Sequence, residues 1–311
     1  MDMQYLIWLQ VQRVNFGDGP EKFFTVFTDS SVGVAMTVAM IIFWCVDKRA
    51  GKFLLLVVAF GRLVNQLLKN TFCVYRPWIL DPDIHPTTAA QSSASSYSFP
   101  SGHTNMATAL YGGLAYWYRK KFPLLIIPCV IIILLVGFSR NFLGMHTPQD
   151  VLVAILETVL VMILVDKLMN FIDNENLLTI GAMFLGVIAA AYLLLKSYPV
   201  DYYNGKVIVE PIRAIRDAAR SLGTFFGIVI GLALERRFVN FKVDVKLSTK
   251  IFRVILGVAL IAAIDFCVVP ALKSLDYKIV SQFFRWFTEN FAATFLIPFL
   301  FTKFEKKFFH N

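Results

Sequence analysis

The chain of 311 residues is far more apolar than a soluble domain of similar length. Hydrophobic residues make up 57% of it, charged residues only 16%, and the mean hydropathy is +0.64, which together indicate an integral membrane protein. The formal net charge of +9 would suit a nucleic-acid-binding protein, but no RNA- or DNA-binding motif accompanies it, and basic residues of membrane proteins gather on the cytoplasmic side. We therefore exclude nucleic acid as a partner. The four cysteines have no metal-ligand spacing, so we expect no metal site and no disulfide framework.

The first 28 residues are expected to form a segment of their own. They lack the basic start and the small-residue cleavage site of a signal peptide. The pattern of Tyr5, Leu6, Trp8 and Leu9 predicts an amphipathic helix that lies at the membrane interface with these side chains against the bilayer. We therefore assign residues 1–28 to an N-terminal interfacial segment.

Nine segments further along the chain are apolar enough to span a bilayer, which takes about 20 residues as a helix. Long continuous apolar runs satisfy their backbone hydrogen bonds as helices, and the alternating pattern of a membrane β-barrel is absent. The sequence therefore predicts an all-α integral membrane protein, a helical bundle with about nine transmembrane helices. These are expected near residues 29–47, 52–69, 103–119, 121–138, 150–167, 177–196, 213–234, 251–270 and 282–302.

Three polar blocks lie at the ends of the second to fifth of these segments. The first is KNTFCVYRP, which contains Lys69 and Arg76, the second is PSGH at residues 100–103, and the third is SRNFLGMHTPQD at residues 139–150. Such side chains between strongly apolar segments indicate a chemical site at a membrane surface.

The third block contains an arginine, a histidine and a carboxylate. Arg140 offers a planar set of donors suited to phosphate. Asp150 follows His146 by four residues and can hold one ring nitrogen, so that the other stays a free nucleophile. Alone, this pair is better explained as a histidine beside a helix-capping aspartate, so the interpretation depends on the other two blocks.

Taken in order, the patterns KxxxxxxRP, PSGH and SRxxxxxHxxxD resemble the three-part signature of the type 2 phosphatidic acid phosphatase (PAP2) superfamily. Every fixed position is filled, and the match covers residues 69–150. The resemblance implies a PAP2-type helical bundle and a phosphatase that needs neither a metal nor a cofactor. It also implies a phosphohistidine intermediate, which would split one difficult displacement into two easier steps.

The resemblance further implies a role for each residue of the blocks. His146 would be the nucleophile, Asp150 would orient it, and His103 would be the general acid that protonates the leaving oxygen. The phosphate would be bound by Lys69, Arg76, Ser101, Gly102 and Arg140. Without the resemblance, Ser101 and Gly102 would be explained as an ordinary helix N-cap, and the basic residues as side chains that mark the membrane boundary.

The distribution of basic residues predicts the topology. With nine spans, one set of loops carries 15 of the 30 lysines and arginines and is cytoplasmic by the positive-inside rule, whereas all three blocks fall on the opposite face. The N-terminus and the active site are therefore expected to be extracytoplasmic, at a bacterial cell membrane, and the C-terminus cytoplasmic. The basic residues concerned are Lys48, Arg49, Lys52, Arg119, Lys120, Lys121, Lys167, Arg236, Arg237, Lys242, Lys246, Lys250, Lys303, Lys306 and Lys307.

Two regions of the chain have an open role. Residues 29–176 are expected to form the PAP2 catalytic core and residues 177–311 a set of C-terminal transmembrane helices, for which a homodimer interface, a substrate vestibule and a carrier-like module all remain open. Within the core, the loop from residue 77 to 100 is either a lid that contacts substrate or a plain connection. Its Asp81, Asp83 and His85 are not expected to bind a metal.

The substrate is also open at this point. The resemblance implies membrane lipids with a phosphate, such as phosphatidate, a sphingoid-base phosphate or a polyprenyl diphosphate. The nine-span layout is similar to that of glucose-6-phosphatases, which makes a soluble phosphate ester the strongest rival. A lipid phosphotransferase with the same intermediate, and a transporter or lipid-binding protein that has lost its site, are further alternatives, although the complete set of motif residues argues against such a loss.

Overall fold

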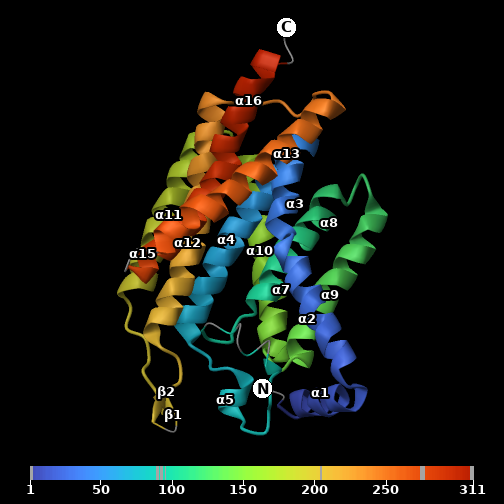
Figure 1. Cartoon of the computed structure of the whole chain (residues 1–311), viewed down its shortest axis with the longest axis vertical. Helices are drawn as coiled ribbons and strands as arrows, with labels where there is room; N and C mark the ends of the chain where they lie inside the picture. Colours follow the sequence, from blue (N-terminus) through green and yellow to red (C-terminus); the bar gives the residue numbers. More distant parts are fainter. Residues whose placement is uncertain are drawn as a thin grey trace. The chain divides into compact units, whose positions relative to one another are not determined.

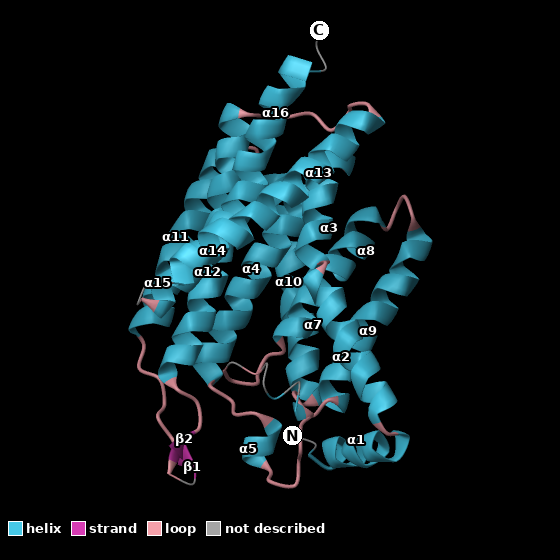
Figure 2. Ribbon diagram, in the orientation of Figure 1, coloured by secondary structure: helices cyan, strands magenta, loops and turns pink. Residues whose placement is uncertain are grey.

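The computed structural model describes residues 3–88, 91, 94, 96–203, 205–273 and 277–308, and the described part consists almost entirely of helices (Figure 2). One short antiparallel hairpin pairs β1 (Tyr202–Tyr203) with β2 (Lys206–Val207). The all-α prediction is therefore confirmed. Part of the predicted loop at residues 77–100, and the side chains of the predicted cytoplasmic Lys306 and Lys307, lie outside what the structure describes.

The helices follow one another along the chain with short connections. In order they are α1 (Met3–Phe16), α2 (Asp18–Gly33), α3 (Ala35–Ile41), η1 (Ile42–Val46), α4 (Lys48–Phe72), α5 (Pro77–Leu80), α7 (Gly102–Ala107), η2 (Thr108–Gly112), α8 (Gly113–Tyr118), η3 (Pro123–Leu125), α9 (Ile126–Phe142), α10 (Pro148–Phe171), α11 (Glu175–Leu195), α12 (Pro211–Phe238), α13 (Leu247–Ala263), η4 (Ile264–Val268), α14 (Val269–Lys273), α15 (Lys278–Phe291), η5 (Ala292–Leu296) and α16 (Ile297–Phe308).

Among the described residues, six helical segments are long and apolar enough to cross a membrane. The predicted spans at residues 103–119, 150–167 and 282–302 are helical too, but they are not among these six. The count of nine crossings therefore stays a prediction. The six segments are Asp18–Val46, Lys48–Leu80, Pro123–Phe142, Glu175–Leu195, Pro211–Phe238 and Leu247–Leu272.

The chain divides into two compact units, and all three sequence blocks belong to the first. Unit 1 comprises Met1–Met36, Val64–Ile163 and Lys196–Asp217. Within it, α2 packs against α7 and α9, and α1 lies against α2 and α9 (Figure 1). Helices that pack this closely need small residues at the contact, and a Cβ at Gly137 of α9 would lie 2.6 Å from Cγ1 of Val151 in α10.

Helix α1 uses its apolar face differently from the prediction. Leu6 and Leu9 are each only 2% exposed, because they belong to an apolar cluster within unit 1. The prediction that these two leucines lie against the bilayer is therefore wrong. An amphipathic pattern indicates that one face of the helix contacts apolar groups, but it does not indicate whether these belong to lipid or to protein. The other buried members of the cluster are Ile84, Phe142, Leu143 and Met145.

Polar contacts reinforce this packing of α1. The guanidinium of Arg13 donates to the backbone oxygen of Phe142 at 2.9 Å and to that of His85 at 2.5 Å. These two carbonyls belong to the C-terminal end of α9 and to the loop after α5. Because hydrogen bonds from a charged donor are the stronger kind, Arg13 ties α1 to the segment that leads from α9 into α10.

Unit 2 comprises Thr37–Leu63, Leu164–Leu195 and Ala218–Asn311. In this unit, α12 presents glycines at positions 223, 227 and 231 to α15 and η5. Small residues four apart let membrane helices approach closely, so that van der Waals contact holds them together. A Cβ at Gly227 would lie only 2.7 Å from the backbone oxygen of Phe287.

A buried arginine is a second anchor of unit 2. Arg253 of α13 is 1% exposed, and its guanidinium donates to both carboxylate oxygens of Glu305 at 2.7 and 2.8 Å. It also donates to the backbone oxygens of Trp44 and Lys242 at 2.8 and 2.9 Å. A buried charge is tolerated when it is paired and hydrogen-bonded in this way.

We predict that Gly227→Ala destabilises the protein by about 1–3 kcal/mol, the usual cost of overpacking a well-packed contact. The added methyl group would push α12 away from the Phe287 carbonyl. Thermal unfolding of the purified protein in detergent measures the effect. Gly181→Ala in α11 is the matched control, because a Cβ there meets nothing within 4 Å; equal stability of the two variants would contradict the close approach.

Candidate active site

The connection between α9 and α10 holds His146 in a fixed position. The backbone N–H groups of Met145 and His146 both donate to the oxygen of Arg140, at 3.0 and 3.2 Å, which satisfies the C-terminal end of α9. Gly144 provides the left-handed turn between the end of α9 and Met145. Its φ is +72°, a conformation that costs glycine little. The side-chain amide of Asn141 donates to the backbone oxygen of His146 at 2.8 Å.

Asp150, in the first turn of α10, combines two functions that the sequence left as alternatives. Its Oδ2 accepts from the backbone N–H of Thr147 at 2.9 Å, and its own N–H donates to the Thr147 hydroxyl at 3.3 Å, which is the reciprocal pattern of a capping box. The same Oδ2 lies 3.3 Å from Nδ1 of His146 and accepts from the Ser98 hydroxyl at 2.5 Å. Asp150 is therefore a helix cap and the partner of His146 at once.

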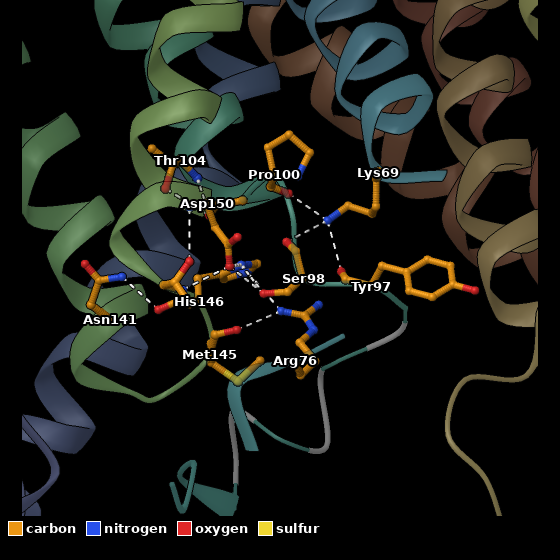
Figure 3. A network of polar contacts seen from close by, with 12 residues as sticks. Lys69, Arg76, Tyr97, Ser98, Pro100, Thr104, Asn141, Met145, His146 and Asp150 are labelled. Carbon is orange, nitrogen blue, oxygen red and sulfur yellow. Dashed lines mark hydrogen bonds and ion pairs between the residues drawn. The ribbon is translucent and has the colours of Figure 1, made fainter. Parts of the chain in front are cut away.

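Arg76 faces the other nitrogen of the same imidazole (Figure 3). Its Nη1 lies 3.0 Å from Nε2 of His146 and also donates to the backbone oxygen of Met145 at 3.1 Å, while its Nε donates to that of Ser96 at 3.1 Å. A guanidinium can only donate, so Nε2 accepts and carries a lone pair. The proton of the neutral ring then lies on Nδ1, toward Asp150.

The surroundings of His146 also favour its neutral form. Burial holds the pKa of His146 well below its ordinary value, and the positive charge of Arg76 lowers it further, whereas Asp150 acts in the opposite direction. The imidazole is 3% exposed. A neutral ring with its lone pair on Nε2 is the form that can act as a nucleophile.

Lys69, near the C-terminal end of α4, binds the loop before α7. Its ammonium group donates to the backbone oxygens of Tyr97, Ser98 and Pro100, at 3.1, 3.1 and 2.7 Å (Figure 3). An ammonium group has three donors, so all of them are used. Lys69 is 5% exposed, and its visible role is to hold the residues that lead into the PSGH block.

Ser101 and Gly102 begin helix α7. The Ser101 hydroxyl accepts from the backbone N–H of Thr104 at 3.4 Å and from its hydroxyl at 2.9 Å, so it is an N-cap. The Ser101 N–H donates to the backbone oxygen of Asp150 at 3.0 Å, which joins the second block to the third. A Cβ at Gly102 would meet nothing within 4 Å, so the space before this helix end is open.

His103 and Arg140 are brought to the same region but do not contact the His146 imidazole through a hydrogen bond that the structure records. The Nε2 of His103 lies 3.4 Å from Oδ1 of Asp29 in α2. Arg140 is 3% exposed, and its Nε has no hydrogen-bond partner among the described residues. A buried guanidinium with an unused donor is suited to bind an anion.

Four polar residues of this region were missed by the sequence analysis. They are Asp29, Ser98, Asn141 and Asp217. Asp217, at the start of α12, accepts from the Ser96 hydroxyl at 2.9 Å, and the Ser96 backbone oxygen in turn binds Arg76. Asn141 lies within the third block and could have been found there, whereas the contacts of the other three depend on the folded chain.

The arrangement is suited to phosphate chemistry. Three basic residues, Lys69, Arg76 and Arg140, are each less than 10% exposed, and preorganised cations of this kind stabilise the negative charge of a phosphoryl group. Beside them lies an imidazole nitrogen with a lone pair. Within the described residues, no group of three or more His, Cys, Asp or Glu side chains is placed to hold a metal ion.

Two family models match the chain. Residues 50–172 match the PAP2 superfamily, and residues 219–307 match the PAP2 superfamily phosphatase transmembrane extension. Together these two ranges cover more than half of the chain. No solved structure matches it.

Curated relatives share parts of the chain. It is 38% identical over 109 residues to phosphatidylglycerophosphatase B of Bacillus subtilis (strain 168), covering 33% of this chain and 49% of that protein. It is 29% identical over 201 residues to sphingosine-1-phosphate phosphatase 2 of Homo sapiens, covering 63% and 47%, and 32% identical over 117 residues to undecaprenyl-diphosphatase BcrC of Bacillus subtilis (strain 168), covering 36% and 56%. The chain thus spans about half the length of these relatives.

Two substitutions are predicted to separate scaffolding from anion binding. Lys69→Met removes the donor of three buried backbone carbonyls. One buried carbonyl without a partner costs about 1–3 kcal/mol, so the free energy of unfolding of the ligand-free protein should fall by at least that much. Arg140→Met removes a buried charge with an unused donor, so the ligand-free protein should lose no stability, but stabilisation by added orthovanadate should vanish. Thermal unfolding with and without orthovanadate measures both effects, and a full vanadate response in Arg140→Met would contradict the assignment.

Proposed function

Because the chain belongs to the PAP2 superfamily, we propose that it is a metal-independent membrane phosphatase that acts through a phosphohistidine on His146. The observation that carries the proposal is the state of that imidazole. Its Nδ1 lies 3.3 Å from the Asp150 carboxylate, and its Nε2 carries the lone pair, which accepts from Arg76 at 3.0 Å until a phosphate group draws Arg76 away. This is the arrangement that an in-line attack on phosphorus requires.

In the first step, a phosphate group enters between Arg76 and the His146 imidazole, and Arg76 turns its donors to the phosphate oxygens. The Nε2 lone pair attacks phosphorus, the bond to the leaving oxygen breaks, and His103 gives that oxygen a proton. The Nδ1 proton stays hydrogen-bonded to Asp150, which stabilises the positive charge that develops on the ring.

In the second step, water attacks the phosphohistidine. The phosphorus–nitrogen bond breaks, free phosphate leaves, and the proton of the attacking water returns to His103, so that both histidines regain their starting states. Arg76 and Arg140 stabilise the transferring group directly. Lys69 contributes its charge and the position of the loop rather than a direct contact, because its three donors already bind the backbone.

We propose a lipid phosphate as the substrate, of the phosphatidate, sphingoid-base phosphate or polyprenyl diphosphate type. The names of the three relatives each specify a lipid that carries phosphate, which supports this class over glucose-6-phosphate.

The proposal predicts phosphate release that survives EDTA and disappears in His146→Ala. Purified protein in detergent would be assayed with phosphatidate, sphingosine phosphate, undecaprenyl diphosphate and glucose-6-phosphate. The loss should be at least about a thousandfold, because removing a nucleophile removes the covalent route itself. An alkali-stable, acid-labile phosphoprotein should form in the parent protein and not in the variant.

The exposed His85 supplies the matched control, and His85→Ala should keep full activity. Release that His146→Ala leaves unchanged would overturn the nucleophile assignment. Preference for glucose-6-phosphate would overturn the lipid class, and transfer of phosphate to an added alcohol rather than to water would identify a phosphotransferase.

We also propose that the site lies on the extracytoplasmic face of a bacterial cell membrane, with the C-terminus in the cytoplasm. The proposal retains residues 29–176 and 177–311 as catalytic core and C-terminal helices, and its orientation rests on the distribution of basic residues. Of the predicted interfacial segment 1–28, the part from Asp18 onward belongs to the candidate membrane span Asp18–Val46. Two exposed residues mark the two faces. Lys120 lies in the basic cluster after α8, on the proposed cytoplasmic face, and Asp83 lies near the first block, on the proposed outer face.

The topology predicts opposite labelling of two single-cysteine variants in a cysteine-free background. Asp83→Cys should react with a membrane-impermeant maleimide in intact cells, because its loop faces the outside. Lys120→Cys, the control, should react only after the cells are opened. Labelling of Lys120→Cys in intact cells would reverse the proposed orientation.

A further inference from the structure

A carboxylate from the N-terminal part of the chain lies next to the predicted general acid. Oδ1 of Asp29 is 3.4 Å from Nε2 of His103, with side-chain exposures of 64% and 31%. Asp29 belongs to α2, and α2 packs against α7, whose first turn contains His103. The PAP2 model match begins at residue 50, so Asp29 lies outside the matched region and outside all three sequence blocks.

The charges around His103 give this contact a specific consequence. Arg140 and Arg76 are both positively charged and lie close enough to His103 to act on it electrostatically. Asp29 is the opposing charge, and it also lies close enough to Arg140 to interact with it. A general acid must hold a proton before the leaving oxygen can take it, so a site rich in cations needs a carboxylate beside that acid.

We propose that Asp29 is a positioning residue for His103: it accepts a hydrogen bond from Nε2–H, so that the imidazolium presents Nδ1–H to the leaving oxygen. This inference rests on the proposed phosphatase function and adds the device that orients its acid and places a negative charge beside it. It extends the catalytic machinery to α2.

The proton balance of this arrangement closes over one turnover. As the phosphorus–oxygen bond breaks and the phosphorus–Nε2 bond to His146 forms, the leaving oxygen takes the Nδ1 proton of His103, which becomes neutral. When water then attacks phosphorus and the phosphorus–nitrogen bond breaks, Nδ1 takes the proton of the water. The Nε2 proton stays on His103 and hydrogen-bonded to Asp29 throughout, and the carboxylate is never protonated.

The test compares leaving groups, because a general acid matters only when the leaving oxygen is basic. Asp29→Asn is expected to slow hydrolysis of the best lipid phosphate about tenfold to a hundredfold, part of the hundredfold to ten-thousandfold that general acids usually contribute. Hydrolysis of p-nitrophenyl phosphate, whose leaving group needs no proton, should change less than about threefold. Asp29→Glu should recover part of the activity on the lipid.

Two controls distinguish positioning from a structural effect. Asp18→Asn removes an exposed carboxylate from the first turn of the same helix, about 16 Å along the helix axis from Asp29 at 1.5 Å per residue, and should leave both activities unchanged. The second control uses His103→Ala, in which the acid is already missing. Adding Asp29→Asn to this variant should not lower its remaining rate of hydrolysis any further, with the lipid or with p-nitrophenyl phosphate.

The results separate this inference from the proposed function. Absence of phosphate release by the parent protein from every substrate would overturn the phosphatase proposal itself. The role of Asp29 alone would be overturned by two results with an active parent protein. Either Asp29→Asn lowers the rates on the lipid and on the aryl phosphate equally, or it does not lower the rate on the lipid.

Discussion

The contact between Arg76 and Nε2 of His146 determines how the rest of the site must be arranged. A guanidinium has no lone pair to offer, so it fixes the tautomer of the imidazole and sends the ring proton to the opposite side. Asp150 must then stand on that side, and the capping box at the start of α10 places it there. Helix capping, tautomer choice and nucleophile orientation thus depend on one another, and a change to any of them would alter the other two.

The buried cations divide into two groups with different energetic roles. Lys69 has committed every donor to backbone oxygens, so its desolvation is offset within the protein and it gives the loop its shape. In Arg140, Nε has no hydrogen-bond partner among the described residues. A bound anion would provide that partner. A buried charge with an unused donor costs stability in the ligand-free protein, which is the opposite of the role of Lys69.

The sequence was sufficient to predict which side chains lie together where local spacing decides it. His146 and Asp150 are four residues apart, and a loop followed by a helix start brings them together. The sequence was insufficient where partners come from distant elements: nothing in the neighbourhood of Asp29 or Asp217 distinguishes them from ordinary surface carboxylates. It was also misleading for Leu6 and Leu9, since the same apolar pattern suits a lipid surface and a protein surface. The number of membrane crossings depends on whether α7–α8, α10 and α15–α16 each cross the membrane. Hydropathy alone does not decide this.

Helix α1 has a practical consequence for anyone who handles this protein. Its leucines and Arg13 support the stretch from Phe142 to Met145, which ends one residue before His146. Helix α1 therefore acts as a buttress for the connection between α9 and α10. Expression variants that trim this end would lose the buttress along with a segment that looks dispensable, and affinity tags are better fused to the other end of the chain.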